Sequence, residues 1–587
     1  MTPKKKAVQF LFPFLLLTVL VAPAQDQKNA GVMFTSRTEF VLVPIVASDK
    51  AGKHITGLTK DDFELQEDGK SKSIASLEEV KTFTSRAIRS APKRDVYSNE
   101  LAGDSSPKRL TIFALDLVNT PFLDQTYARE QLIKYLAHEA NPEEPIALVA
   151  IRLSGIEVLH DFSSDPAVLV AALKRASGDV AANELVVTGS TATSSRPFNP
   201  SEINGESRAL QQFISGDSPT GQVQIALQAN AIDATLEAFQ HVAEAFAGIP
   251  GRKSLIWATA AFPFGLDAAT GGILAPTVYR EGTLMNTPLF GDRRSRTGAL
   301  PSFPSIDDVR SNGQLTRLEP VYQRTLQMLN DANIAVYPVD ARGLMVFFPG
   351  ADVSRIEGWN SLNRALFEGS RDTMVNFAAM TGGKAFYDRN DLDVAFAKAA
   401  DDSSSYYMLG YYLDKNAKPG WHKLQVKAKR GGIEVRARSG FFVIPPERQH
   451  DTSRMDIRMA LVSPLDYTAV PLSVRWDVLT AAGAKRKAHF ELNIPPNSNV
   501  VDSANNGVLD LEVVAQARDA TGQPADQCAQ HVQAKLGAEA LQQWQRDGLN
   551  YTNDIIVPPG QYSVRFVVRD NLTGRLGSVT APLLATR

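Results

Sequence analysis

Residues 110–121 constrain the fold of this chain more than any other stretch. An apolar run from Leu110 ends at Asp116, a polar turn follows, and Asp124 opens an amphipathic helical run that extends to Ala140. A strand-length apolar segment followed by a turn and a helix is typical of the first βα unit of an open α/β sheet. Ligands of such sheets bind beyond the carboxyl ends of the strands, so Asp116 lies where a site is expected.

Length and charge set the broad class of protein. A chain of 587 residues is too long for one core, so we expect roughly two to four domains. Lys and Arg total 62 against 64 for Asp and Glu, a net charge of -2. Nucleic-acid-binding proteins usually carry a concentrated basic surface, so this balance argues against nucleic acid as a partner.

The N-terminus has the pattern of a secretory signal peptide. Lysines at positions 4–6 precede an apolar run from Val8 to Val21, and a small-residue cleavage site ends at Ala24. The run is shorter than the roughly 20 apolar residues that a membrane-spanning helix needs. We therefore expect an exported protein, periplasmic or extracellular, that is cleaved near Ala24 and keeps no stable membrane anchor.

Cys528 is the only cysteine. The chain therefore forms no internal disulfide, and its stability must come from its hydrophobic cores. We expect the Cys528 side chain to act as a small buried hydrophobic group and not as a reactive thiol.

Hydrophobic periodicity predicts an α/β plus all-β fold. Alternating strands and helices predict a Rossmann-like α/β domain whose mainly parallel sheet has an antiparallel third strand at its edge. Its six expected strands are 110–116, 145–153, 155–162, 254–258, 334–339 and 384–387. Short β-rich runs with Gly-containing turns predict a small N-terminal β module and a later β meander. Further strand-like runs predict a C-terminal immunoglobulin-like β-sandwich.

These patterns divide the chain into consecutive units. In order they are a signal peptide 1–24, a tether 25–37, the β module 38–81, a linker 82–107, the α/β domain 108–402 with insertions at about 178–221 and 262–316, the β meander 403–445, a linker 446–454 and the β-sandwich 455–587. The two insertions are rich in Gly, Ser, Thr, Asn or Pro, the residue types that favour loops.

The residues of the α/β region carry a resemblance to a known family. The strings at 115–121, 247–257, 381–383 and 438–441, and the N-terminal stretch 43–69, resemble VWFA-related proteins, a divergent von Willebrand factor A-type group found in secreted bacterial proteins, mostly of Acidobacteria. The resemblance covers most of residues 38–445. It implies that the α/β region is a von Willebrand factor A-type domain.

The resemblance also implies where a divalent metal, usually magnesium, would bind. In the family's motif the ion is held by an Asp-x-Ser-x-Ser turn, a later threonine and an aspartate after the fourth strand. This sequence keeps Asp116 and has Thr120 for the second serine, but Val118 replaces the first, and 258–262 contains no carboxylate. Thr235 is one candidate for the later threonine. Because Mg²⁺ requires near-ideal oxygen geometry, we expect a degenerate site in which Asp116, Asn119 and Thr120 hydrogen-bond the turn.

Known catalytic motifs are missing from the sequence. The eight histidines form no H-E-x-x-H motif, and there is no G-x-S-x-G elbow. Residues 248–254 resemble a phosphate loop only superficially, because their spacing differs and they precede a strand. Asp388, Asn390, Asp391 and Asp393 lack the glycine and distal Glu of a calcium-binding EF-hand, so a helix cap is their expected role.

These observations favour a non-enzymatic, exported binding protein. It would use a von Willebrand factor A-type domain, through Asp116, Asn119 and Thr120, to bind an unknown protein or glycan in the cell envelope. One alternative is an envelope hydrolase or processing factor with an unrecognised site in the long insertions. A second is a structural spacer, for which these three residues would be dispensable.

Overall fold

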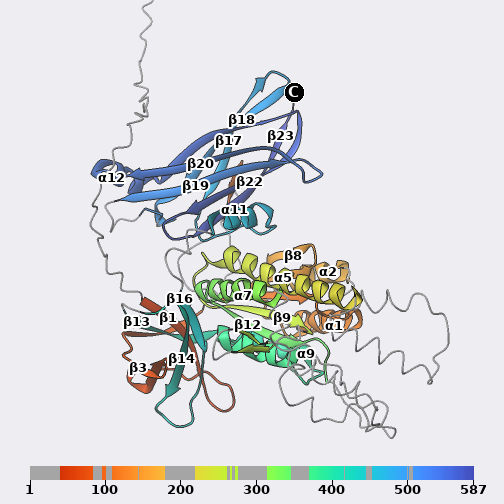
Figure 1. Ribbon diagram of the computed structural model, residues 1–587, viewed down its shortest axis with the longest axis vertical. Helices are drawn as coiled ribbons and strands as arrows, with labels where there is room; N and C mark the ends of the chain where they lie inside the picture. The colour runs from red at the N-terminus through yellow and green to blue at the C-terminus, as the bar shows by residue number, and fades with distance from the viewer. Residues whose placement is uncertain are drawn as a thin grey trace, which may run out of the picture.

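The computed structural model contains an α/β domain and two β-rich domains, one beside the α/β domain around β1 and β14 and one above it around β19 and β22 in the view of Figure 1. The predicted signal peptide and tether lie outside the described residues, as do most of the two predicted insertions. No helix within the described part of the chain is long and apolar enough to cross a membrane. The described residues are 40–82, 95–100, 109–142, 144–176, 178, 219–260, 265–267, 272–274, 314–344, 369–414, 417–443, 452–498, 500–501 and 507–586.

The α/β domain is built on a five-stranded sheet in the order β12-β9-β6-β7-β8. Four strands are parallel and β8 is an antiparallel edge strand, so the predicted topology is confirmed. Every residue of β6, β9 and β12 is buried, as a sheet covered on both faces requires. The strands are β6 (Leu110–Asp116), β7 (Ile146–Arg152), β8 (Gly155–Ser163), β9 (Lys253–Thr259) and β12 (Ile334–Asp340).

The sixth predicted strand was wrong. Residues 384–387 contribute only one bridge, between Phe386 and Val339. Phe386 is buried against β12 and its N–H donates to the Pro338 carbonyl oxygen at 2.8 Å. This segment is therefore held at the edge of the sheet without a ladder of its own.

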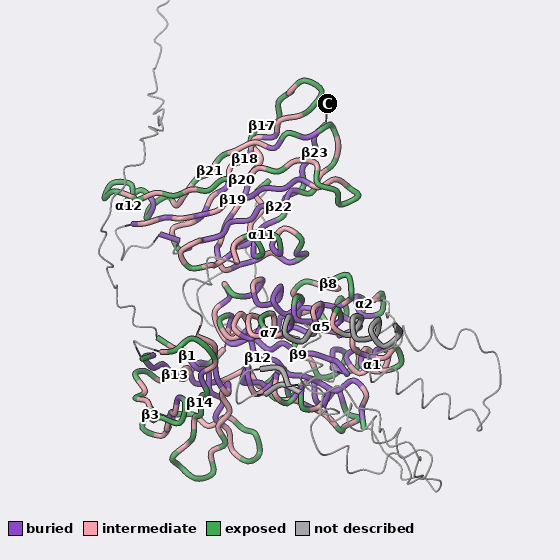
Figure 2. The backbone as a smooth tube through the Cα atoms, in the orientation of Figure 1, coloured by how far each residue is buried: buried purple, intermediate pink, exposed green. Residues whose placement is uncertain are grey.

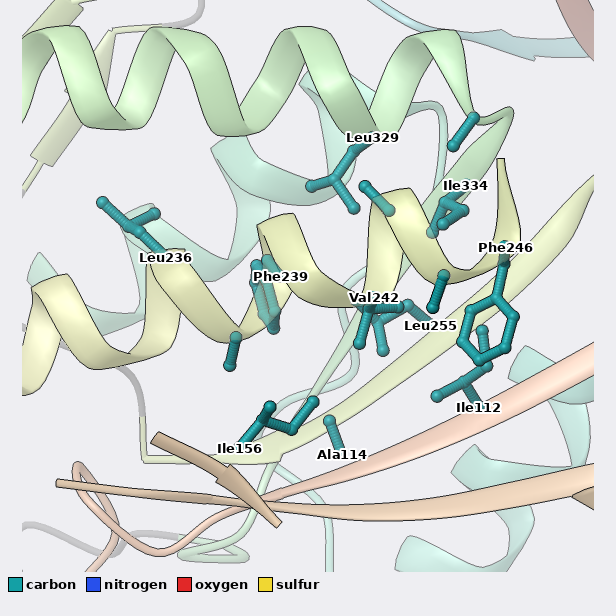
Figure 3. Packing of buried hydrophobic residues seen from close by; sticks show 14 of the residues in the cluster. Ile112, Ala114, Ile156, Leu236, Phe239, Val242, Phe246, Leu255, Leu329 and Ile334 are labelled. Carbon is teal, nitrogen blue, oxygen red and sulfur yellow. The ribbon is translucent and has the colours of Figure 1, made fainter. Parts of the chain in front are cut away.

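Helices cover both faces of this sheet. On one face α5, α7 and a helix over 369–381 pack on alternate β6 residues, including Ile112 and Ala114 (Figure 3). On the other face α1, α2 and α9 pack against Phe113 and Leu115. The helices are α1 (Phe122–His138), α2 (Pro166–Arg175), α5 (Pro219–Phe246), α7 (Gln314–Asp331) and α9 (Leu392–Asp401). The helix α1 begins earlier than predicted, so Asp124 lies in its first turn and Pro121 takes the capping position.

The N-terminal β module and the β meander form one domain, which corrects their separation in the sequence-based division. Strand β1 pairs with β13 and β15, and β2 pairs with β14. The two sheets have the orders β15-β1-β13-β4 and β16-β14-β2-β3 and enclose a shared core. Both neighbours of β1 come from the meander, so the N-terminal segment completes a sheet that the meander supplies. The strands are β1 (Phe40–Ser48), β2 (Phe63–Glu67), β3 (Lys70–Lys72), β4 (Ser76–Lys81), β13 (Ser405–Tyr412), β14 (Gly420–Ala428), β15 (Glu434–Ala437) and β16 (Gly440–Val443).

The C-terminal domain consists of two four-stranded antiparallel sheets around one core. Their orders are β21-β18-β17-β5 and β20-β19-β22-β23. Strand β5 comes from the predicted linker 82–107, and α11 begins inside the predicted linker 446–454, so both linkers were assigned too broadly. The strands are β5 (Val96–Ser98), β17 (Ser473–Ala482), β18 (Lys485–Ile494), β19 (Val508–Arg518), β20 (Pro524–Lys535), β21 (Leu549–Val557), β22 (Gly560–Asp570) and β23 (Leu576–Ala585).

Short elements complete the described structure. The C-terminal domain carries α11 (Ser453–Val462), which packs on β22, and α12 (Ala538–Asp547). Figure 2 shows that the buried residues follow the central strands, whereas the hairpin tips of both β-rich domains are exposed. The remaining elements are η1 (Lys60–Asp62), β10 (Gly265–Asp267), β11 (Gly272–Leu274) and η4 (Pro496–Ser498).

Candidate functional site

The candidate site is the carboxyl edge of the parallel sheet, where β6, β9 and β12 end. Asp116 is the last residue of β6, Thr259 of β9 and Asp340 of β12. Because β12, β9 and β6 are adjacent and parallel, these three residues come to one edge.

Asp116 is buried beneath this edge, with 1% of its surface exposed. Its Oδ1 accepts hydrogen bonds from the backbone N–H groups of Val118 and Asn119 at 3.2 and 3.0 Å. The Asn119 amide Nδ2 lies 3.1 and 3.0 Å from the two carboxylate oxygens. The Oδ2 atom accepts from Trp257 Nε1 at 3.0 Å and from Thr259 Oγ1 at 2.8 Å. Both oxygens are therefore fully engaged by protein donors.

Burial and hydrogen bonding act in opposite directions on Asp116. Burial raises the pKa of the carboxyl group, because it disfavours the charged form. The hydrogen bonds from Asn119, Thr259 and Trp257 favour the ionised form and oppose that rise. The donors thus replace the water that the carboxylate loses on folding.

Asn119 and Thr120 extend this network to neighbouring elements. Asn119 Nδ2 donates to Thr235 Oγ1 on α5 at 2.9 Å, and Thr235 Oγ1 donates in turn to the Ala231 carbonyl oxygen at 3.1 Å. Thr120 Oγ1 accepts the backbone N–H of Ala260 at 3.1 Å. The turn after β6 is therefore tied to α5 and to the end of β9.

The structure brings together the three residues predicted to form the interaction face, but Asp116 and Thr120 are each only 1% exposed, so they support the edge from beneath and do not form its surface. Two further members of this network, Trp257 and Thr259, were not predicted. Thr235, considered only as a later threonine for a metal, is part of the network through Asn119. Trp257 and Thr259 were missed because they were assigned to a buried strand and a following loop. They could have been predicted from strand pairing, because a strand β9 that runs parallel to β6 ends beside Asp116.

The residues present do not fit a magnesium ion in the manner that the resemblance implies. Mg²⁺ requires oxygen ligands in near-octahedral arrangement. An indole N–H occupies one side of Asp116 Oδ2, and Trp257 is a donor with no lone pair to offer a cation. The Thr120 hydroxyl oxygen already accepts the Ala260 N–H. The geometry is that of a hydrogen-bonded turn.

Asp340, at the same edge, is also engaged. Its carboxylate receives Arg342 Nε and Nη2, both at 2.8 Å, and the backbone N–H of Arg342 at 3.0 Å. Such a two-point contact matches the guanidinium fork to the carboxylate. Among the described residues, the two aspartates that end β6 and β12 thus serve to hold local structure.

Exposed apolar side chains follow the ends of three strands at this edge. Phe122 and Leu123 begin α1 directly after the β6 turn, Leu153 follows β7, and Leu344 follows β12. Their exposed fractions are 48%, 80%, 43% and 50% in that order. A single exposed leucine needs no explanation, but several at one edge indicate a surface suited to contact with another molecule.

The other motifs considered from the sequence have structural roles. Asp388 and Asp391 pair with Arg371 and Arg389 at 3.0 and 2.5 Å, and Asp393 pairs with Lys134. Asp391 takes the N-cap position of α9, but its side chain makes no capping hydrogen bond and pairs with Arg389 instead, so the predicted cap role was wrong except for its position.

The segment that superficially resembled a phosphate loop is also structural. Lys253 is buried, and its Nζ donates to the Ile249 carbonyl oxygen at 2.5 Å. It lies at the first position of β9, opposite the carboxyl edge.

Cys528 is half-buried beside the C-terminal core, and burial raises the pKa of its thiol.

The fold and this edge define a mixed α/β domain with a closed hydrogen-bonded network, set between two β-rich domains. No protein-family model matches the chain, and no curated protein matches it.

Likenesses to solved structures are slight. A membrane protein related to aerotolerance from Bacteroides fragilis is 10% identical over 50% of this chain and 98% of its own, with a TM-score of 0.21. A β-glucuronidase of glycoside hydrolase family 2 is 10% identical, with a TM-score of 0.14, and the match covers 19% of this chain and 11% of that enzyme. A family 2 glycosyl hydrolase from Bacteroides cellulosilyticus is 10% identical over 30% of this chain and 20% of its own, also at 0.14. At these TM-scores the likenesses carry no argument about activity.

Proposed function

We propose that this chain is a non-enzymatic binding protein that contacts its partner through the carboxyl edge of the α/β sheet. The observation that carries the proposal is the pairing of a closed network at Asp116 with exposed apolar side chains around it. The network holds the turn rigidly, and the exposed residues supply contact area. A rigid scaffold that presents exposed groups is what a binding surface requires.

We propose further that the α/β domain is of the von Willebrand factor A type, within an exported VWFA-related protein. The strand order with an antiparallel edge strand supports this, together with the sequence strings at 115–121 and 247–257. The C-terminal pair of antiparallel sheets supports an immunoglobulin-like classification of that domain. The partner would be a protein or glycan of the cell envelope.

Site-specific photo-crosslinking tests the proposed surface. A photoreactive residue is placed at Leu123, which is 80% exposed at the edge, and in a separate variant at Leu584, which is 57% exposed on β23. Both full-length variants are irradiated with envelope fractions. We expect a discrete adduct from position 123 that is missing from position 584.

Two results would overturn the proposal. One is the same set of adducts from both positions, which would indicate nonspecific contact. The other is no adduct from position 123, nor from position 153 at the same edge, across the conditions tried. Turnover of an envelope substrate by the chain would favour the hydrolase alternative.

A further inference from the structure

Glu67, Asp68 and His422 form a compact cluster in the N-terminal β-rich domain, remote from the carboxyl edge. His422 Nδ1 lies 3.1 Å from Glu67 Oε1 and 3.0 Å from Asp68 Oδ2. One ligand-type atom from each residue falls within 4.8 Å of the other two. Glu67 and His422 are buried, whereas Asp68 is exposed and leaves one side of the cluster open to solvent.

The backbone holds these residues in place although they are distant in sequence. Glu67 ends β2 and pairs with Leu424 of β14. Asp68 adopts a positive φ of 50° in the Asp-Gly turn that leads to β3. Its N–H donates to the Lys423 carbonyl oxygen at 2.9 Å, and its Oδ1 accepts the Lys423 N–H at 2.9 Å. The Oδ2 atom is thereby directed at His422.

The second ring nitrogen of His422 determines how the imidazole faces the carboxylates. Nε2 lies 2.7 Å from the Lys418 carbonyl oxygen, which only accepts hydrogen bonds, so Nε2 carries a proton. Nδ1 faces two carboxylate oxygens at hydrogen-bond distance, so the space between them holds either a proton on Nδ1 or a cation that takes its place. Donation of the other ring N–H to a backbone carbonyl is the second-shell contact typical of metal-ligating histidines.

Two buried polar atoms beside the cluster point to a missing ligand. Glu67 is 4% exposed, and its Oε2 has no hydrogen-bond partner among the described residues. The Tyr411 hydroxyl, on a residue that is fully buried, has no well-aligned hydrogen bond there either, and burial and then the nearby Glu67 carboxylate raise the pKa of this hydroxyl. Lys72 Nζ lies 3.6 Å from Glu67 Oε2 but is directed to Asp414 at 2.7 Å. A buried carboxylate left partly unsatisfied is costly unless something else compensates it.

The charge balance favours a divalent cation. Glu67, Asp68 and Asp414 bring three carboxylates together, whereas Lys72 pairs with Glu67 and Asp414 and Lys70 acts on Asp414 alone. No lysine pairs with Asp68 among the described residues, so the carboxylates that face His422 carry net negative charge. Carboxylate oxygens accept many divalent cations, but an imidazole ligand favours transition metals over Mg²⁺ and Ca²⁺.

We propose that Glu67, Asp68 and His422 bind Zn²⁺ or a similar divalent transition-metal cation. Three protein ligands and a water in the fourth position form a common zinc arrangement, with bonds of about 2.0–2.1 Å. A tetrahedron with such bonds separates neighbouring ligand atoms by roughly 3.3 Å. The distances of 3.0 and 3.1 Å from His422 Nδ1 approach that value, so small side-chain shifts suffice to admit the ion.

A cation here would join β2 to β14. Glu67 and Asp68 precede the α/β domain in the sequence, and His422 follows it. Binding to the folded state alone would stabilise the β-rich domain by mass action. The site therefore supplies a metal-dependent connection between the N-terminal strands and the rest of the chain.

Calorimetric titration of the untagged full-length chain with ZnCl₂ tests the proposal, and thermal unfolding is measured in parallel. We expect one saturable site per chain and a rise in Tm of several degrees. Asp68→Asn keeps the Oδ1 acceptor for Lys423 and tolerates the positive φ, so the turn is preserved. Because loss of a second-shell contact alone weakens metal binding about 10- to 100-fold, Asp68→Asn and His422→Gln should each weaken it at least about tenfold.

His489→Gln is the matched control. His489 also faces a carboxylate, with Nδ1 2.9 Å from Asp554 Oδ1, but Lys487 pairs with that carboxylate at 2.7 Å. This variant should bind zinc as the parent chain does. Equal affinity in Asp68→Asn and the parent, or no saturable binding of Zn²⁺, would overturn the proposal and leave His422 as an ion-pair partner of the two carboxylates. Circular dichroism of each variant verifies its fold.

Discussion

The indole Nε1 of Trp257 donates a hydrogen bond to Asp116 Oδ2 over 3.0 Å, across two adjacent parallel strands. This contact fills one acceptor position of the carboxylate with an indole N–H. Thr259, two residues further along β9, donates to the same oxygen. Together these bonds account for a buried aspartate without a metal or a basic partner, because the donors offset its loss of water.

Replacing Asp116 with alanine should destabilise the α/β domain strongly. The variant leaves the Trp257 and Thr259 donors buried without their acceptor, and each unsatisfied buried group costs about 1–3 kcal/mol. We expect a total loss of about 3 kcal/mol or more, measured by calorimetry on the full chain. Asp116→Asn, which keeps one acceptor oxygen, should lose less. A loss below about 1 kcal/mol for the alanine variant would contradict the role given to Asp116.

Magnesium should have little effect on the α/β domain. Since protein donors already occupy both Asp116 oxygens, adding or chelating Mg²⁺ should leave the Tm of this domain within about 1 °C of its starting value. The measurement is thermal unfolding with and without chelator, repeated with millimolar Mg²⁺. A stabilisation by Mg²⁺ that disappears in Asp116→Ala would show that the ion does bind there.

Glu244, on α5 near the C-terminal domain, should make stability fall as pH rises. Burial, with the nearby negative charge of Asp456 as a second cause, raises the pKa of Glu244 to about 8. The unfolded carboxyl group titrates near its usual value, so between those two pH values the folded state holds a proton that the unfolded state has released. Stability is therefore lost as pH rises towards 8. Glu244→Gln should unfold like the parent at pH 5 and gain about 1–2 kcal/mol at pH 8.

Glu237 on the same helix is the control for this pH effect. A hydrogen bond from His241 lowers the pKa of Glu237, so its carboxylate contributes stability that is present at neutral pH and lost as pH falls. Glu237→Gln should therefore gain nothing at pH 8. Equal gains in both glutamine variants would indicate a general charge effect and would contradict the assignment to Glu244.

Gly248 should be required for the contact between the α/β domain and the C-terminal domain. Its N–H donates to Thr468 Oγ1 at 3.0 Å, and a Cβ atom at position 248 would lie 2.0 Å from the Thr468 carbonyl oxygen. Gly248→Ala should cost about 1–3 kcal/mol by forcing the backbones apart, measured by calorimetry and limited proteolysis. Gly431→Ala, where nothing lies within 4 Å, should be near neutral. Comparable losses in both would contradict the proposed clash.

Local patterns predicted the α/β sheet well. Strands β6, β7, β9 and β12 were predicted because continuous apolar runs of strand length mark strands that are buried on both faces. Strand β20 carries no such signal, since it lies at a sheet edge and is rich in polar residues. Residues 384–387 were wrongly predicted as a strand, because Phe386 packs against the sheet but the segment forms only a single bridge with β12.

The candidate site was predicted in part. Asp116, Asn119 and Thr120 lie within one turn, so their sequence spacing already placed them together. Trp257 and Thr259 lie some 140 residues further along, and nothing local to them indicates an aspartate as a partner. Val118 and the run 258–262, which contains no carboxylate, already predicted a degenerate metal site. The side chains that donate to Asp116 from β9 could be identified only in the folded structure.

The sequence by itself determined the buried strands of the α/β sheet and the helices that cover them, because burial of apolar side chains at strand or helix spacing is a local property. Only the tertiary structure decided how those segments pair. It placed β1 between β13 and β15, moved β5 from a predicted linker into the C-terminal sheet, and set Glu67 and Asp68 against His422. Pairing between distant strands depends on which apolar faces cover one another best, and that choice involves the whole chain.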